Sequence, residues 1–306
     1  MIIKPGDGVS IVAPASQLRG NDQGLLTSAI ALLESWKLRV CVRVDNGHHF
    51  YLAGTDAVRA DHLNAALADP ETKVIFCTRG GYGTARLLPH LKCDTHPPLK
   101  ILVGYSDITA LHLAVRRLWP HFDVIHGPNV ATRQFLGEEP GCELTRQSLR
   151  EALFSANHIV AEQLEFLRPG KAQGRLEGGC LSLVVSTLGT KYAPRTKGAI
   201  LFIEDTGEAP YRIDRMLTQL KNAKKLDDLR GVVFGAMRNC TDPHNDLREV
   251  LKDFFWESSF PVAFGLRSGH GEVNLSLRLG ARAELDSEKS WFRMATDSGH
   301  SQSLIF

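Results

Sequence analysis

The first half of the chain alternates between short apolar runs and longer segments in which apolar residues recur at helical spacing. The apolar runs predict strands at residues 8–13, 38–44, 73–78, 101–103 and 122–126. The segments between them predict helices at residues 25–36 and 55–68 and directly after residue 106. Strands and helices in this order indicate an α/β fold with a doubly wound parallel sheet.

The pattern changes near the middle of the chain. Residues 134–141 are rich in turn-forming residues, and we place a domain junction between about residues 135 and 165. This predicts an N-terminal domain over residues 1–150 and a C-terminal domain over residues 165–306. Within the second half the pattern predicts strands at 199–203, 231–236 and 262–266, helices at 180–188 and 211–220, and an edge strand at 276–285.

Composition excludes several classes of function. The chain of 306 residues has a formal net charge of +2 and no basic cluster interleaved with aromatic residues, so we expect no nucleic-acid partner. It has no apolar run of membrane-spanning length and enters a polar turn at its start, so we expect neither a membrane contact nor a signal peptide. Six scattered cysteines without a C-x-x-C pair favour free thiols and a cytoplasmic location. The histidines lack metal-binding spacing, and we expect no metal and no other cofactor.

Ser106 stands where the predicted strand 101–103 passes through a glycine into a helix. At a helix N-terminus, free backbone N–H groups favour negative charge, which suits a serine whose attack creates an oxyanion. A serine at this place is also a common helix cap. The α/β-hydrolase pattern G-x-S-x-G is absent, because Ile108 takes the place of its second glycine.

Two further reactive side chains share this placement, because Glu204 ends one predicted strand and His270 follows another. In open α/β sheets, catalytic groups collect at the carboxyl ends of strands. A serine, a histidine and a carboxylate are together the components of nucleophilic acyl transfer. Asp205 and Glu208 are alternative acids, and His270 between its glycines is also consistent with an ordinary turn residue.

The segment Arg79-Gly80-Gly81-Tyr82-Gly83 follows a strand and precedes a helix, as a phosphate-binding loop does. It lacks the G-K-[ST] of a P-loop and the spacing of G-x-G-x-x-G, so a nucleotide site has little support. The backbone N–H groups of Gly80 and Gly81 are instead candidates for the second donor of an oxyanion hole, beside the N–H of Asp107.

These residues belong to a longer ordered set of motifs that runs nearly end to end. The set comprises Pro5-Gly6-Asp7, Ile11-Val12-Ala13-Pro14, Ala53-Gly54-Thr55-Asp56 with Arg59, Arg79-Gly80-Gly81-Tyr82-Gly83, Gly104-Tyr105-Ser106-Asp107-Ile108-Thr109, Gly178-Gly179 with Leu181-Ser182-Leu183, Gly189-Thr190, Glu204-Asp205, Pro210-Tyr211-Arg212-Ile213-Asp214-Arg215, and Gly269-His270-Gly271 with Asn274. With this set the chain resembles the LD-carboxypeptidases, serine peptidases of murein recycling.

The resemblance implies a Ser–His–Glu triad in which Ser106 is the nucleophile, His270 the base and Glu204 the orienting acid. It also implies a flavodoxin-like N-terminal domain, a smaller β-rich C-terminal domain, an active site between them and a homodimer. The implied reaction is hydrolysis of the L–D peptide bond that releases terminal D-Ala from a murein tetrapeptide. The chain departs from the family at Cys180, where Asn is common, and at Arg278, where Pro is common.

A carboxypeptidase must also hold the terminal carboxylate of its substrate. Arg79, Tyr82 and Arg212 are the candidates for substrate binding, and either arginine is equally consistent with a structural ion pair. Three other functions stay open from the sequence: an immunity peptidase that cleaves peptidyl-nucleotide antibiotics, a non-catalytic peptide-binding module, and a nucleotide-binding protein.

Overall fold

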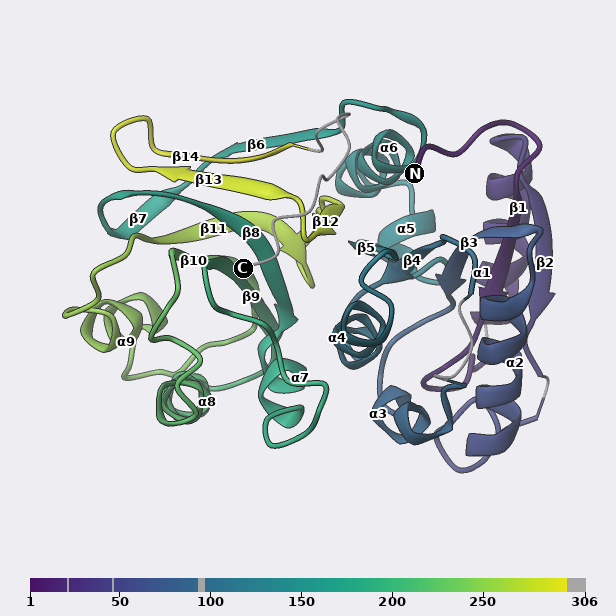
Figure 1. Ribbon diagram of the computed structural model, residues 1–306, viewed down its shortest axis with the longest axis horizontal. Helices are drawn as coiled ribbons and strands as arrows, with labels where there is room; N and C mark the ends of the chain where they lie inside the picture. The colour runs from purple at the N-terminus through teal and green to yellow at the C-terminus, as the bar shows by residue number, and fades with distance from the viewer. Residues whose placement is uncertain (21, 46, 93–96, 296–306) are drawn as a thin grey trace.

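The computed structural model describes residues 1–20, 22–45, 47–92 and 97–295, and its two sheets lie side by side (Figure 1). In the described part of the chain the first sheet has the strand order β12-β5-β4-β3-β1-β2. Its strands are β1 (Gly8–Val12), β2 (Arg39–Arg43), β3 (Thr72–Cys77), β4 (Ile101–Gly104), β5 (Asp123–His126) and β12 (Leu277–Leu279). The pairs among β1 to β5 are all parallel, and their order 2-1-3-4-5 is that of flavodoxin-like sheets, which confirms the predicted fold class.

Helices cover both faces of this sheet, because successive residues of each strand point to opposite sides. One face packs against α1 (Asp22–Ser35), α5 (Arg133–Leu136) and α6 (Pro140–Phe154). The other face packs against α2 (Asp56–Ala68), α3 (Thr84–Leu87) and α4 (Ile108–Leu118), and the 3₁₀-helix η1 (Leu88–His90) follows α3. Strand β3 shows both environments, since Val74 and Phe76 contact the first set and Ile75 and Cys77 the second.

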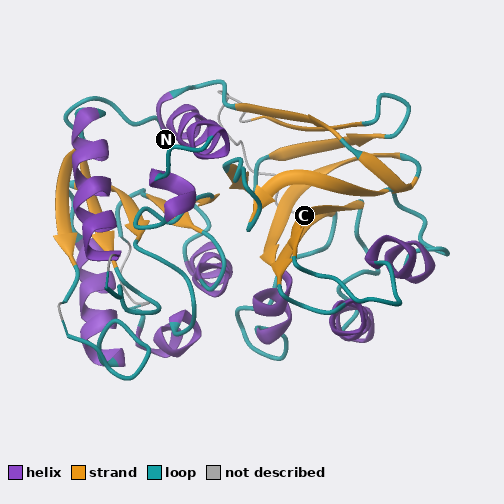
Figure 2. Cartoon of the chain, turned by 180° about the vertical axis from the view of Figure 1, so that it is seen from behind, coloured by secondary structure: helices purple, strands orange, loops and turns teal. Residues whose placement is uncertain are grey.

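The second sheet has the strand order β6-β14-β13-β8-β9-β10-β11-β7. Its strands are β6 (Ile159–Gln163), β7 (Glu165–Arg168), β8 (Lys171–Cys180), β9 (Ala199–Thr206), β10 (Gly231–Arg238), β11 (Val262–Gly269), β13 (Arg282–Asp286) and β14 (Trp291–Ala295). The central strands β8 to β11 are parallel, and the outer pairs are antiparallel. Helices α7 (Leu181–Ser186), α8 (Pro210–Asn222) and α9 (Leu247–Phe254) gather on one face of this sheet (Figure 2).

The other face of the second sheet faces the first half of the molecule. Ile200, Phe202 and Val233 from this face share one apolar core with Leu111 and Val115 of α4. Helix α4 also contacts α7 through Leu113. The element that begins directly after Ser106 is therefore packed between the two halves.

The predicted edge strand at 276–285 is in fact two strands in different sheets. Its first part, β12, pairs antiparallel with β5 in the first sheet, and its second part, β13, pairs with β8 in the second. A turn in which the N–H of Ala281 donates to the carbonyl of Arg278 at 3.2 Å separates them. None of the helices in the described ranges has the length and apolarity of a membrane span.

Candidate active site

Ser106 occupies a sharp turn between β4 and α4. Its φ of 64° lies in the left-handed region that residues with a side chain rarely adopt. Gly80 lies directly beside this turn, and a Cβ at Gly80 would come 3.0 Å from Ser106 Oγ and 2.9 Å from Ser106 Cβ. The strained turn and the missing side chain of its neighbour together leave the hydroxyl of Ser106 accessible.

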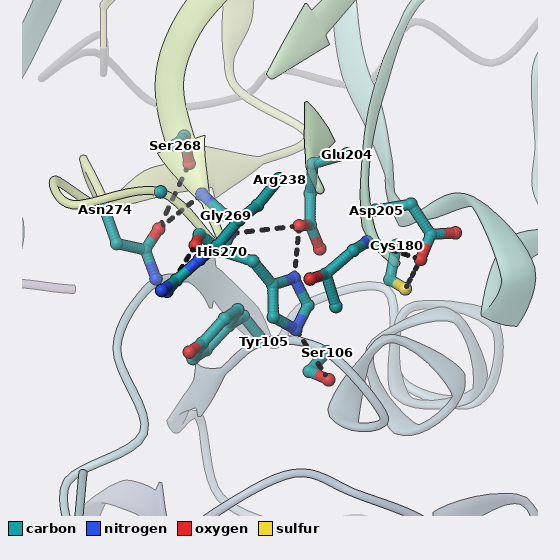
Figure 3. A network of polar contacts seen from close by, with 12 residues as sticks. Tyr105, Ser106, Cys180, Glu204, Asp205, Arg238, Ser268, Gly269, His270 and Asn274 are labelled. Atoms are coloured by element: carbon teal, nitrogen blue, oxygen red, sulfur yellow. Dashed lines mark hydrogen bonds and ion pairs between the residues drawn. The ribbon is translucent and has the colours of Figure 1, made fainter. Parts of the chain in front are cut away.

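The three predicted catalytic side chains form a continuous chain of hydrogen bonds (Figure 3). His270 Nε2 lies 3.1 Å from Ser106 Oγ, and His270 Nδ1 lies 2.6 Å from Glu204 Oε2. The backbone N–H of His270 also donates to Glu204 Oε2 at 3.2 Å. Glu204 comes from β9 and His270 follows β11, so two strands of the second sheet bring the pair to Ser106, which follows the carboxyl end of β4 in the first sheet.

Burial sets the electrostatics of this pair. Glu204 is fully buried, which raises the pKa of its carboxyl against the opposing hydrogen bonds from His270. Burial acts to lower the pKa of His270, but the hydrogen bond and negative charge of Glu204 outweigh it, and the pKa of His270 is raised. A carboxylate at Nδ1 holds the proton on that nitrogen, which leaves Nε2 as the acceptor toward Ser106.

Gly269 permits the close contact between acid and base. Its φ is 106°, and a Cβ there would lie 2.4 Å from Glu204 Oε2. Any side chain at this position would therefore displace the carboxylate that His270 contacts.

Gln134 of α5 holds the loop that carries His270 from the opposite side. Its Nε2 donates to the carbonyl of Gly269 at 2.9 Å and to that of Gly271 at 2.7 Å. Asn274 completes the arrangement, because its Oδ1 accepts from the N–H of Gly269 at 2.8 Å and its Nδ2 donates to Gln134 Oε1 at 3.3 Å. A helix of the first half thus holds the base that the second half supplies.

Backbone N–H groups lie beside the nucleophile. Those of Asp107, Gly80 and Gly81 have no hydrogen-bond acceptor among the described residues. The carboxylate of Asp107 is buried and accepts from the N–H of Thr84 at 2.8 Å, so this residue offers the site its amide rather than its side chain. The arrangement suits an oxyanion between the Asp107 amide and the glycine loop.

A cavity of about 310 Å³ opens at Ser106 and His270. Arg79, Gly80 and Gly81 line it, as does Arg133. The other lining residues are Leu25, Tyr105, Asn129, Ala131 and Thr132. Two of the predicted substrate-binding residues lie outside this lining: Tyr82 is 47% exposed beside Tyr51, and Arg212 lies on α8 with Glu208 3.6 Å away.

The alternative acids point elsewhere. Asp205 accepts hydrogen bonds from the backbone N–H groups of Ser182 and Thr206, both at 2.8 Å. Glu208 faces Arg212 on the surface. Among the three carboxylates considered from the sequence, Glu204 alone contacts the imidazole of His270.

The two departures from the family pattern lie outside the cavity lining. Cys180 is buried with Sγ 3.3 Å from Ser182 Oγ and 3.6 Å from an oxygen of Asp205, and burial raises the pKa of its thiol. Arg278 lies in β12, where its guanidinium contacts Asp123 at 2.7 Å and donates to the carbonyl of Ala152 at 2.7 Å. Arg278 therefore ties β12 to its neighbour β5 and to α6.

Arg133, Asn129 and Gln134 were not singled out from the sequence. All three follow β5, so the rule that ligands gather beyond the carboxyl ends of strands gives a signal for this segment. Nothing local to the sequence indicates that Gln134 contacts Gly269 and Gly271.

Comparisons with known proteins agree with this geometry. Residues 9–127 match the family model of the LD-carboxypeptidase N-terminal domain, and residues 173–285 match that of the LD-carboxypeptidase C-terminal domain. A probable murein peptide carboxypeptidase of Bacillus subtilis is 36% identical over 296 residues, covering 93% of this chain and 90% of that protein. A murein tetrapeptide carboxypeptidase of Pseudomonas aeruginosa is 32% identical over 306 residues, covering 94% and 95%.

Solved structures show the same architecture. The muramoyltetrapeptide carboxypeptidase of Oxalobacter formigenes superposes with a TM-score of 0.82 at 29% identity, covering 94% of this chain and 98% of that one. A microcin C7 self-immunity protein superposes with a TM-score of 0.86 over 96% and 97% of the chains, and at 22% identity this likeness shows the fold alone. With both halves matched by the family models and full-length relatives above 30% identity, the chain belongs to the LD-carboxypeptidase family.

Proposed function

We propose that the protein is a serine carboxypeptidase that hydrolyses the L–D peptide bond of a murein tetrapeptide and releases its terminal D-Ala. The observation that carries the proposal is the hydrogen-bonded series from Ser106 through His270 to Glu204 at the cavity. The murein substrate is supported by the names of the relatives in Bacillus subtilis and Pseudomonas aeruginosa.

In the first half of the reaction, His270 Nε2 takes the proton of Ser106 Oγ as the oxygen attacks the scissile carbonyl carbon. The separation of 3.1 Å is within hydrogen-bond reach, so the proton can pass directly from Ser106 Oγ to His270 Nε2. The tetrahedral intermediate places its negative oxygen near the Asp107 amide and the Gly80–Gly81 loop. The imidazolium formed at His270 is stabilised by the buried carboxylate of Glu204.

Collapse of the intermediate breaks the C–N bond, and the amine of D-Ala leaves with the proton from His270 Nε2. The tripeptide then remains as an ester on Ser106 Oγ. A water molecule loses a proton to His270, attacks the ester carbonyl and releases the tripeptide acid, while the proton returns to Ser106. Atoms and charges balance without a metal or another cofactor.

The terminal carboxylate of the substrate requires a cation in the cavity. We assign this role to Arg79 and Arg133, because both line the cavity that Ser106 enters. A guanidinium matches a carboxylate with two parallel N–H donors. Arg212, which lies outside the lining, is not part of this assignment. We further propose that the enzyme acts in the cytoplasm as a homodimer, as the family resemblance implies.

Mass spectrometry of the products tests the substrate. The protein is incubated with L-Ala-γ-D-Glu-meso-diaminopimelate-D-Ala and, in parallel, with the same peptide ending in L-Ala. We expect release of one D-Ala and the tripeptide from the first peptide, and far slower release from the second. An intact first peptide together with cleavage of a peptidyl-nucleotide would replace this substrate by the alternative one, and equal cleavage of both peptides would refute the L–D preference.

A further inference from the structure

A second cavity of about 260 Å³ lies between the two halves of the molecule, remote from Ser106. Its walls come from the second half of α4 and the residues just after it, from β8 and from the segment before β9. Ser106 precedes the first turn of the same helix of 11 residues, so roughly 16 Å of helix, at 1.5 Å per residue, separates the two sites. The lining residues are Leu113, Arg116, Arg117, Pro120, Arg175, Glu177, Ala193, Pro194 and Arg195.

This lining has a large excess of positive charge. It contains four guanidinium groups and one carboxylate, a net of 4 − 1 = +3. Glu177 is already paired with Arg116 at 2.5 Å, and Arg116 also donates to the carbonyl of Leu279 at 2.7 Å. Among the described residues, the exposed guanidinium groups of Arg117, Arg175 and Arg195 form no ion pair, and the nearby charge of Glu177 acts on Arg195 without contacting it.

Such a grouping of like charges is unfavourable unless an anion offsets it. Burial and then the charge of Arg117 lower the pKa of Arg195, and the negative charge of Glu177 offsets this only in part, so repulsion acts between α4 and the segment before β9. Many arginines elsewhere on the surface face a carboxylate, as Arg39 faces Glu71 and Arg267 faces Glu162. The three guanidinium groups without an ion pair, by contrast, line one and the same cavity.

We propose that this cavity is a binding site for a phosphate-bearing ligand. Guanidinium groups match phosphate oxygens with paired N–H donors, and several arginines around one cavity suit an anion with more than one negative charge. Leu113, Pro120 and Pro194 supply apolar wall beside them, with room for the remainder of a phosphate ester. The site is independent of the peptidase reaction, and a ligand in it contacts both halves of the molecule.

Isothermal titration of the full chain with pyrophosphate at low ionic strength tests the proposal. The test variant is Arg117→Gln/Arg195→Gln, and the matched control is Arg150→Gln/Arg230→Gln, which removes the same charge from exposed positions outside the cavity. We expect the wild type and the control to bind one pyrophosphate per chain, and the test variant to bind at least tenfold more weakly.

Thermal unfolding provides a second readout and a check on folding. Without ligand, the test variant should unfold at the wild-type temperature or above it, since the substitution relieves repulsion. Pyrophosphate should raise the midpoint of the wild type and control and leave the test variant unchanged. Orthophosphate and a sugar phosphate, titrated in parallel, distinguish a free phosphate from a phosphate ester as the ligand.

Three results would overturn the proposal. The first is no binding of any of these phosphates by the wild type, and the second is equal weakening in the test and control variants, which would indicate only the overall charge. The third is equally tight binding of succinate, which would make the site one for carboxylates.

Discussion

Gln134 offers a sharp test of how the two halves cooperate, because it belongs to α5 yet holds the loop of His270, the proposed base. Replacing it by alanine removes the hydrogen bonds to the carbonyls of Gly269 and Gly271. It also removes the acceptor of Asn274 Nδ2. His270 lies between these two carbonyls, so its imidazole would lose the support that fixes its distance to Ser106 Oγ.

The size of the effect follows from the two bonds to the carbonyls on either side of His270. Two neutral hydrogen bonds contribute about 1 kcal/mol each, so the ordered conformation of the loop loses about 2 kcal/mol of stabilising free energy. If that loss appears wholly in the transition state, kcat falls roughly 30-fold, at 1.36 kcal/mol per factor of ten. We expect KM to change little, because Gln134 is absent from the lining of the cavity beside Ser106.

Steady-state D-Ala release measures both parameters, with thermal unfolding as the check on folding. Gln147→Ala is the matched control, since Gln147 is an exposed glutamine on α6 whose side chain bonds to the exposed Glu151 at 2.9 Å and, within the described ranges, to no other residue. A kcat of Gln134→Ala within twofold of the wild type would show that the loop holds His270 without this bond. A rise in KM alone would make Gln134 a substrate-binding residue instead.

Three further expectations follow from the same geometry. Because Glu204 raises the pKa of His270, kcat/KM should fall on the acid side with a midpoint above 6.5. The substitution Glu204→Gln should lower both that midpoint and kcat. A midpoint that the substitution does not move would contradict the assignment. Gly80→Ala should lower kcat at least 100-fold in the D-Ala assay, because the added Cβ would lie 3.0 Å from Ser106 Oγ. Near-normal turnover would show that Gly80 does not lie so close to Ser106. Arg133→Gln should raise KM for the tetrapeptide about tenfold or more, and Arg212→Gln should leave it unchanged; the reverse pattern would move the carboxylate site to α8.

The sequence could predict that Ser106, Glu204 and His270 lie near one another, because each stands at the carboxyl end of a strand with a clear apolar pattern. The runs at 101–103, 199–203 and 262–266 correspond to β4, β9 and β11. A continuously apolar run of this length identifies a buried parallel strand, and such strands end at a common edge.

Strand β14 was not predicted, although its Phe292 and Met294 are fully buried. The strands β6 and β7 were not predicted, because their apolar residues are few and partly exposed. β6, for example, buries only Val160 fully among its five residues. The apolar pattern could not predict that residues 276–285 are divided between two sheets. Alternation of apolar and polar residues indicates a strand but not the strand with which it pairs.

Contacts between distant parts of the chain account for the rest. The bonds from Gln134 span 135 and 137 residues of sequence, and no local pattern encodes them. The arginine-lined cavity likewise collects residues from α4, β8 and the segment before β9. The cavity follows from the packing of α4 between the two halves, and the sequence indicates α4 only as another amphipathic helix.

The most direct test of the central claim is the rate of D-Ala release by Ser106→Ala from the murein tetrapeptide. We expect the variant to fold normally and to lose about 10⁶-fold in kcat, the order found when a serine that acts as part of a triad is removed. Ser186→Ala, which alters an exposed serine on α7, should retain the wild-type rate. Turnover by Ser106→Ala within tenfold of the wild type would contradict the assignment of Ser106 as the nucleophile.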